Sequence, residues 1–257
     1  MTTEPTVDER LRGRAEPAER PVMRQIWRHL GFLHWPVDRD ALAPLLPPGL
    51  EPDTFGGVAY VGIVPFTISL SRTASFAVPL APKFHELNLR TYVHRNGRSP
   101  GVWFFSLDAA SHLAVMAARL TYGLPYFYAR MSMQVNGEPT SPTIVYESRR
   151  GGRTKGSGGS GTFRGRYGPT GPVAAAAPGT LEFFLVERYL LYAWNGRSLS
   201  EARVHHAPYP LQSATVADLT ETLTSAAGLP QPSGAPAHVH YSREVDVHIY
   251  RPHRVAR

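Results

Sequence analysis

The chain contains no cysteine among its 257 residues. This absence excludes disulfide bonds, thiolate nucleophiles, iron–sulfur clusters and zinc sites built from cysteine. Zinc-finger and glycine-rich phosphate-loop motifs are missing as well, and we expect no cofactor. Any chemistry must therefore come from histidine, carboxylate, tyrosine, serine or lysine side chains, or from a bound ion.

Long apolar runs are also lacking: the sequence has none of the ~18 residues that a membrane-spanning helix needs. Residues 1–20 are charged, poor in aromatic side chains, and without the apolar stretch of a secretory signal. We expect these twenty residues to form a disordered N-terminal arm. Residues 21–257 are predicted to form a single domain of a cytoplasmic protein that does not bind membranes.

Lysine is scarce: only Lys83 and Lys155 are lysines among the 27 basic residues. The formal charge of the chain is +7. A basic chain can bind nucleic acid when its positive charges gather in one patch. Here the arginines are spread from Arg10 to Arg257. We therefore predict no nucleic-acid partner.

The remaining pattern is that of strands. Apolar and polar residues alternate, or β-branched and aromatic residues cluster, in several segments: 25–37, 57–70, 85–95, 101–107, 141–150, 161–169 and 238–250. Short helices are expected at 38–46, at 109–122 with Asp108 as the cap, and at 215–228 before Gly228. Residues 151–162 are rich in glycine and serine and are predicted to be a mobile loop. The pattern predicts an α+β domain with a strongly curved antiparallel sheet or barrel and a few packed helices.

One predicted strand carries a polar face formed by Glu86, Asn88, Arg90 and Tyr92, which alternate with apolar residues. Glu86 and Arg90 lie ~13 Å apart along an extended strand, too far to pair directly. Each needs another partner. Two interpretations stay open: the face lines an internal cavity that binds a ligand, or it is an ordinary solvated face.

The histidines offer two further candidates. His238, His240 and His248 project to one side of the last predicted strand, where imidazoles can ligate a metal, but a solvated strand edge is favoured and we predict no metal site. His205 and His206 face opposite sides of a strand, so only one of them can face a pocket. A purely structural role for that histidine stays open.

The segment YGLPYF at residues 122–127 ends a predicted helix, with Gly123 at the left-handed cap and Pro125 preventing its continuation. Together with FHELNLRTYV, GVWFFSLDA, HHAPYPLQSA and YSREVDVHIY, it resembles the YqjF-like family of uncharacterised bacterial proteins within the acetoacetate decarboxylase-like superfamily. The resemblance extends over about residues 24–252. It implies a curled antiparallel β-barrel with an internal cavity and helices packed outside.

The resemblance also implies which residues meet the ligand. FHELNL is similar to the segment that carries the cavity glutamate of acetoacetate decarboxylases, which places Glu86 at that position. YGLPYF is similar to their G-x-P-K-K motif, whose first lysine forms a Schiff base, but Tyr126 and Phe127 replace the two lysines. A phenol cannot condense with a ketone, so acetoacetate decarboxylase activity is expected to be absent. Lys83 remains an alternative Schiff-base lysine, whereas Lys155 lies in the glycine-rich loop.

We therefore predict a pocket for a small acidic or carbonyl compound with general acid–base chemistry. Such an enzyme would be a lyase, isomerase or hydrolase without a Schiff-base lysine. Non-catalytic binding of a small ligand and a structural role are the alternatives, and assembly into a homo-oligomer stays open. The candidate catalytic residues are Glu86, Tyr126 and His206, and the candidate ligand-binding residues are Asn88, Arg90, Arg119, His205 and Tyr209.

Overall fold

The structure is a computed structural model that describes residues 4–73, 83–151, 159–232 and 234–255. Most of the predicted mobile loop at 151–162 lies outside the described residues. The described residues form thirteen strands: β1 (Met23–Val37), β2 (Glu51–Pro52), β3 (Ala59–Thr73), β4 (Phe84–Arg95), β5 (Arg98–Ala109), β6 (Tyr126–Glu138), β7 (Ser141–Arg150), β8 (Gly161–Pro169), β9 (Leu190–Trp194), β10 (Leu199–His206), β11 (Leu211–Glu221), β12 (His238–Ile249) and β13 (His253–Arg254).

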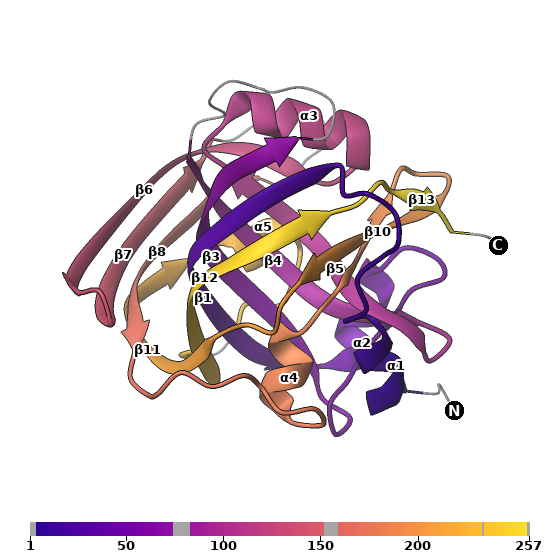
Figure 1. The fold of residues 1–257 in the computed structure, drawn as a ribbon, viewed down its shortest axis with the longest axis horizontal. Coiled ribbons are helices and arrows are strands. Elements are labelled where there is room, and N and C mark those ends of the chain that lie inside the picture. Colours follow the sequence, from indigo (N-terminus) through magenta and orange to yellow (C-terminus); the bar gives the residue numbers. More distant parts are fainter. Residues whose placement is uncertain (1–3, 74–82, 152–158, 233, 256–257) are drawn as a thin grey trace.

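Helices occupy much less of the described chain. They are α1 (Val7–Arg12), α2 (Arg39–Leu42), the 3₁₀ turn η1 (Ala43–Leu45), α3 (His112–Tyr122), α4 (Leu181–Val186) and α5 (Leu223–Ala226). In Figure 1, α3 lies over one end of the curved sheet, whereas α1, α2 and α4 lie toward the opposite end.

The sheet closes on itself. Its strand order is β13-β10-β9-β5-β6-β7-β8-β11-β12-β1-β3-β4-β2, and additional pairings join β10 to β12 and β5 to β4. These two pairings close a ring of β1, β3, β4, β5, β9, β10 and β12. The prediction of a strongly curved sheet or barrel is confirmed, although the sheet is mixed because β5 runs parallel to both β6 and β9.

The alternation along β4 separates two interiors. Leu87 and Leu89 are fully buried and pack with Tyr146 and Tyr167 in a solid apolar core between the ring and strands β7 and β8. The intervening residues of β4 point to the opposite side, into the ring. One strand therefore supplies an apolar face to the core and a polar face to the ring.

Two predicted helices differ in the structure. Ser111 caps α3 by accepting the Ala114 N–H, while Asp108 remains in β5, where its carboxylate pairs with a buried arginine. The helix predicted at 215–228 is mostly absent: residues 215–221 belong to strand β11 because this part of the strand pairs with β8, and only the short helix α5 follows. Gly123 ends α3 with φ 66°, which confirms the predicted left-handed cap.

The N-terminal segment also differs from the expectation of a disordered arm. From Glu4 onward it is described, and it forms α1. Arg10 of α1 pairs with the buried Asp53, and Glu4 accepts hydrogen bonds from Thr54. The segment lacks apolar bulk, but its charged side chains have buried partners far along the chain.

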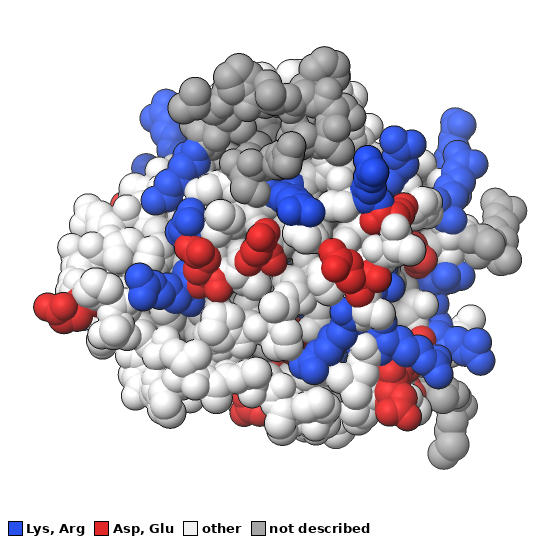
Figure 2. Space-filling view, viewed as in Figure 1, with Lys and Arg blue, Asp and Glu red and all other residues white. Residues whose placement is uncertain are grey.

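The surface carries charges of both signs. Figure 2 shows basic and acidic side chains interspersed on the face viewed. One surface ion pair joins Arg28 to Glu244 at 2.5 Å. Among the described residues, no helix has the length and apolar character needed to cross a membrane.

Candidate functional site

A cavity of about 510 Å³ lies inside the ring of strands. Its walls are mainly apolar and aromatic, with side chains from β1, β3, β4 and β5 and from the inner face of α3. The larger apolar side chains of the lining include Trp27, Phe32, Phe66, Phe84, Phe104 and Leu107. Cavities of this size and composition are typical of small-molecule sites.

Three polar side chains of β4 line this cavity in a row. Glu86 is 3% exposed, Asn88 5% and Arg90 7%, and all three belong to the cavity wall. Of the two interpretations of the polar face, the structure therefore supports the cavity lining rather than a solvated face. Tyr209, another predicted binding residue, also lines the cavity.

Glu86 lies at the end of the cavity covered by α3. The Tyr126 hydroxyl donates a hydrogen bond to Glu86 Oε2 at 3.0 Å. Burial raises the pKa of Glu86 to about 8; the hydrogen bond from Tyr126 opposes this rise, and the nearby Asp108 carboxyl adds to it. Glu86 is therefore mostly protonated near neutral pH.

Tyr126 is the first residue of β6, and its backbone pairs in parallel register with Leu107 of β5. The predicted helix ends before this residue, but strand β6 was not predicted; its signal is the alternation of apolar and polar residues in 127–135. Burial, and then the neighbouring Glu86, raises the pKa of Tyr126 well above its ordinary value. The phenol therefore stays protonated and acts as a hydrogen-bond donor.

Behind Glu86 lies an ion pair that the sequence analysis did not find. Arg150 Nη1 donates to Asp108 Oδ1 at 3.0 Å, and both side chains are at least 96% buried. Burial raises the pKa of Asp108 to about 6, although Arg150 opposes the rise. The Arg150 guanidinium also lies 4.4 Å from the centre of the Phe127 ring.

The other end of the cavity carries arginines. Arg90 Nη2 donates to the Leu185 carbonyl at 3.1 Å, and Arg188 Nε donates to the Phe184 carbonyl at 2.9 Å. Both guanidinium groups lie over the ring of Tyr92, at 5.6 Å for Arg90 and 4.8 Å for Arg188. Both arginines therefore lie beside Tyr92, and both line the cavity.

Polar atoms of this wall are left without partners. Within the described structure, no hydrogen bond satisfies Asn88 Oδ1, Arg90 Nε or Arg188 Nη2, and all three atoms are buried. A buried polar group without a partner is unusual and costs free energy. These atoms identify the wall as a place for a polar ligand group.

Asp53 holds the arginine end together. It is fully buried, accepts a hydrogen bond from Arg188 Nη1 at 2.7 Å and pairs with Arg10 from α1. Burial alone would raise the pKa of Asp53, but Arg188 and Arg10 outweigh it and hold the pKa below its usual range. Burial lowers the pKa of Arg188 to about 10, so that it remains charged at neutral pH. The sequence analysis missed this group; the signal was a charged pair, Glu187–Arg188, directly after the apolar run 183–186.

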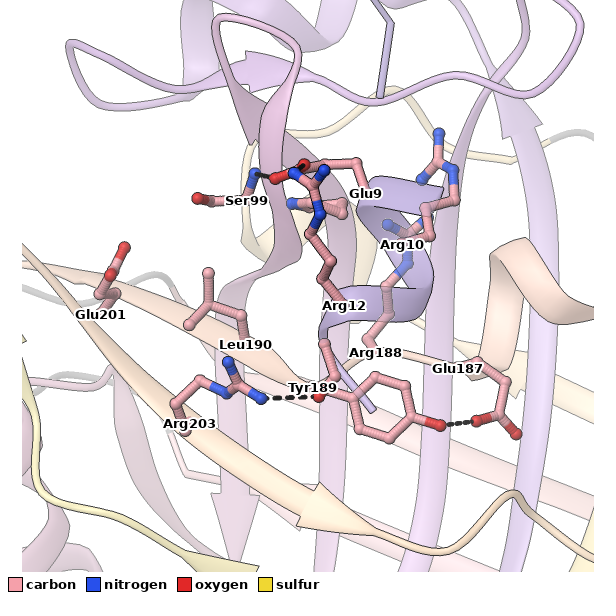
Figure 3. Close-up of a pocket in the computed structure, with 12 residues that line it drawn as sticks. Glu9, Arg10, Arg12, Ser99, Glu187, Arg188, Tyr189, Leu190, Glu201 and Arg203 are labelled. Atoms are coloured by element: carbon pink, nitrogen blue, oxygen red, sulfur yellow. Dashed lines mark hydrogen bonds and ion pairs between the residues drawn. The ribbon is translucent and has the colours of Figure 1, made fainter. Parts of the chain in front are cut away.

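A second pocket of about 140 Å³ lies between α1 and the strands beside it (Figure 3). It shares Arg188 and Leu190 with the large cavity, so the two spaces adjoin. In Figure 3 the Tyr189 hydroxyl contacts Glu187, and Arg203 donates to the Gly13 carbonyl at 2.7 Å. The contact with Gly13, the residue that caps α1, holds the end of this helix against β10.

Three predicted site residues lie outside the cavity lining. His206 is buried between Tyr189 and Tyr209, with ring centres 4.7 Å and 4.4 Å away, and contacts the Ala207 carbonyl at 2.8 Å. Burial lowers its pKa to about 4, so it is a neutral structural histidine. The ring of His205 lies 6.1 Å from that of His248 on the other side of the strand.

The third of these residues, Arg119, is exposed. Its Nε donates to the main-chain carbonyl of Tyr126 at 2.6 Å, so it supports the start of β6 from outside. Lys83 is exposed and also lies outside the cavity lining, while Lys155 falls outside the described residues. In the described part of the chain, no group of three or more histidines and carboxylates gathers as metal ligands.

The fold and its cavity define a class of protein. MppR, an enduracididine biosynthesis enzyme solved in complex with pyruvate, superposes with a TM-score of 0.61 at 16% identity, over 94% of this chain and 93% of MppR. An acetoacetate decarboxylase from Legionella pneumophila superposes with a TM-score of 0.60 at 14% identity, over 100% of this chain and 97% of that enzyme. The chain therefore has the acetoacetate decarboxylase-like fold.

The family follows from sequence comparison. Residues 24–246 match the DUF2071 family, described as an uncharacterized conserved protein. The chain is also 39% identical over 227 residues to the uncharacterized protein YqjF of Bacillus subtilis (strain 168), covering 88% of this chain and 89% of YqjF. The chain belongs to the DUF2071 family, and the resemblance found in its sequence is confirmed.

Proposed function

We propose that the protein binds a carbonyl-containing organic acid in the large cavity and transfers a proton to it from Glu86. The observation that carries this proposal is a carboxyl group held neutral inside an apolar cavity, with a tyrosine hydroxyl at 3.0 Å. A carboxyl whose pKa lies near the working pH is suited to general acid catalysis. The pyruvate bound by MppR, which shares the fold, supports a 2-oxo acid as one member of the ligand class.

The proposed reaction begins with a single proton transfer. The O–H bond of the Glu86 carboxyl breaks, and the carbonyl oxygen of the ligand gains the proton. The carboxylate that remains accepts the hydrogen bond of the Tyr126 hydroxyl, which favours the ionised form of Glu86. Protonation of the carbonyl makes the adjacent carbon more acidic. In a second transfer the Glu86 carboxylate accepts the proton that leaves this carbon, which gives the enol and regenerates the neutral carboxyl, so enolisation is the simplest reaction of this class.

No Schiff base enters this proposal. Tyr126 occupies the position that the sequence resemblance gives to the reactive lysine, and a phenol cannot form an iminium. Lys83 is exposed and outside the cavity lining. We therefore propose that acetoacetate decarboxylation through an iminium is absent.

Non-catalytic binding of the same ligand is the second candidate. It is favoured by the absence of any histidine from the cavity lining within the described residues, because proton removal from carbon then has no imidazole base. The two candidates share the ligand and differ in turnover.

Deuterium exchange separates them. The protein is incubated in D₂O with pyruvate and with longer oxo acids, and loss of the protons next to the carbonyl is followed by NMR. We expect exchange that falls by ~10²-fold or more in Glu86→Gln, with ligand binding retained. Binding without exchange in the unchanged protein would favour the non-catalytic candidate, and no binding of any oxo acid would overturn the proposal.

Glu187→Gln provides the matched control. Glu187 is a buried carboxyl that contacts a tyrosine hydroxyl, as Glu86 does, but it lines the smaller pocket. We expect its exchange rate to remain within about twofold of the unchanged protein. Borohydride is added in parallel with each oxo acid, and a mass increase from a trapped adduct would show that a Schiff base forms after all.

A further inference from the structure

The arginine end of the cavity carries excess positive charge. Arg10 and Arg188 pair with Asp53 there, and Arg90 and Arg188 both lie over the ring of Tyr92. The neighbouring Glu187 is engaged by the Tyr189 hydroxyl and the Tyr209 N–H, and lies 3.9 Å from Arg14. Buried charges are stable only when they are paired, so this end of the cavity is suited to an anion.

Donors for that anion are present in the wall. Arg90 Nε and Arg188 Nη2 are buried without a hydrogen-bond partner in the described structure, on two side chains that lie over the same tyrosine ring. Guanidinium groups bind carboxylates strongly because several N–H donors in one plane match the two oxygens. A ligand carboxylate placed here would satisfy both arginines.

The end of the cavity that carries Glu86 is called the acid end here. Its distance from the arginine end sets the length of the ligand. Glu86, Asn88 and Arg90 follow one another on one face of β4, which puts the first and the last ~13 Å apart along the strand. Between them the cavity wall is formed largely by apolar side chains, and the cavity volume is about 510 Å³. Cavities of ~300–1,000 Å³ hold drug-sized ligands, so a three-carbon acid would leave most of this space unfilled.

The acid end of the cavity, where Glu86 lies, is next to helix α3. Helix α3 covers it with Ala114, Ala117 and Ala118 on the cavity wall, and Leu113 lines the cavity while 72% of the residue is exposed. The arginine end lies at the opposite side of the molecule, beside α1 and α4 (Figure 1). With its charged head group at the arginine end, the rest of the ligand would therefore extend toward α3.

Resting on the proposed function, we propose that the ligand is an elongated, largely apolar carboxylic acid. Its carboxylate binds between Arg90 and Arg188, its apolar body follows the face of β4, and an oxo group at its far end meets Glu86 and Tyr126. This names the class of ligand that the cavity selects: acids with a carbonyl remote from the carboxylate, in place of short oxo acids.

Titration calorimetry on the full chain tests the proposal with pyruvate, octanoate, decanoate, ω-oxodecanoate and decanol. We expect affinity to rise on the order of 10⁴-fold from pyruvate to decanoate, since decanoate has about seven more chain carbons and each buried methylene contributes ~0.8 kcal/mol. Decanol, which lacks the charge, should bind at least ~10-fold more weakly than decanoate. Equal affinity for decanol and decanoate would overturn the carboxylate site.

Arginine variants locate the head group. Arg90→Gln should weaken decanoate by ~10-fold or more and leave decanol within about twofold, which also shows that the cavity is still folded. Arg90→Lys keeps the charge and should lie between the two. Arg203→Gln is the matched control, because Arg203 also donates to main-chain carbonyls but lines the smaller pocket, and it should bind decanoate normally.

The outcomes distinguish this inference from the proposed function. If pyruvate binds as tightly as decanoate and exchanges its protons, the elongated ligand is wrong while proton transfer from Glu86 stands. If decanoate and ω-oxodecanoate bind but no carbonyl compound exchanges, the ligand class stands and catalysis does not. If none of the acids binds, both proposals fail.

Discussion

Two buried acids near opposite ends of one cavity have pKa values shifted in opposite directions: Glu86 lines one end, and Asp53 pairs with Arg188 at the other. Glu86 is 3% exposed and Asp53 is fully buried, so water stabilises neither. The pKa of Glu86 is raised to about 8 by burial, whereas two arginines hold the pKa of Asp53 below its usual range despite burial. The cations beside each carboxyl, and not the depth of burial, decide which of the two is charged.

Asp108 fits between these extremes. It is as buried as Asp53 but has one arginine partner, Arg150, and its pKa is raised to about 6. Glu86 has a tyrosine hydroxyl and no ion-pair partner among the described residues. The pKa rises from Asp53, with two arginine partners, through Asp108, with one, to Glu86, with none, as charge pairing predicts. The unpaired acid, Glu86, faces the cavity.

The largest effect is expected when Asp53, the carboxylate at the arginine end, is removed. Asp53→Ala leaves Arg10 and Arg188 buried near each other without a carboxylate, and we expect a loss of ~3–5 kcal/mol in the free energy of unfolding. Urea denaturation at neutral pH measures this loss. Asp53→Asn, which keeps one of the two acceptor oxygens but not the charge, should lose less.

The matched control for this variant is Glu244→Gln. Glu244 pairs with Arg28 at 2.5 Å, but 32% of the Arg28 side chain and 50% of the Glu244 side chain remain exposed. Its loss should therefore stay within ~0.5 kcal/mol. Equal losses for Asp53→Ala and Glu244→Gln would show that the arginine end is not the tightly coupled cluster described above.

A second variant, Glu86→Gln, removes the titratable carboxyl at the acid end of the cavity. Since the folded pKa of Glu86 is raised from 4.5 to about 8, the folded state binds more protons between these values, and stability falls as the pH rises through this window. The cost approaches ~1.4 kcal/mol per pH unit. Between about pH 6 and about pH 8, Glu86→Gln should therefore remove a fall of ~2 kcal/mol in the free energy of unfolding.

Denaturation with urea at the two pH values checks this prediction, with Glu147→Gln as the control. Glu147 is half exposed and pairs with Arg164 across β7 and β8, so its replacement should leave the slope of stability against pH unchanged. A slope that persists in Glu86→Gln would mean that another group titrates in this window and that Glu86 is ionised in the folded protein.

Local pattern predicted the parts of this molecule that depend on near neighbours in sequence. The period of two in 86–93 identified β4 and its polar face, and the glycine and proline of YGLPYF identified the end of α3. The family resemblance added the closed sheet. It also singled out Glu86 and Tyr126, which the structure joins by a hydrogen bond across 40 positions of sequence.

The arginine end could not be predicted in this way. Asp53 meets Arg10 across 43 positions and Arg188 across 135, and no periodicity links such distant residues. The histidine assignment failed for a related reason: alternation shows that His205 and His206 face opposite sides, but only packing shows that His206 is enclosed by aromatic rings. Pairings that depend on tertiary packing require the structure.

The smallest effect is expected when the Tyr126 hydroxyl, which contacts Glu86 at the acid end, is removed. Tyr126→Phe removes the hydroxyl that donates to Glu86 and favours its ionised form, so the pKa of Glu86 should rise further. The fall of stability with pH then continues to a higher pH, with a change of ~0.5–1.5 kcal/mol in unfolding free energy on the alkaline side. Tyr128→Phe is the control, because Tyr128 lies two residues along β6 and is exposed. It should leave the fall of stability at alkaline pH unchanged. A fall that moves to lower pH in Tyr126→Phe would show that the phenol favours the neutral carboxyl, and Tyr126 could not then stabilise the carboxylate left by proton transfer.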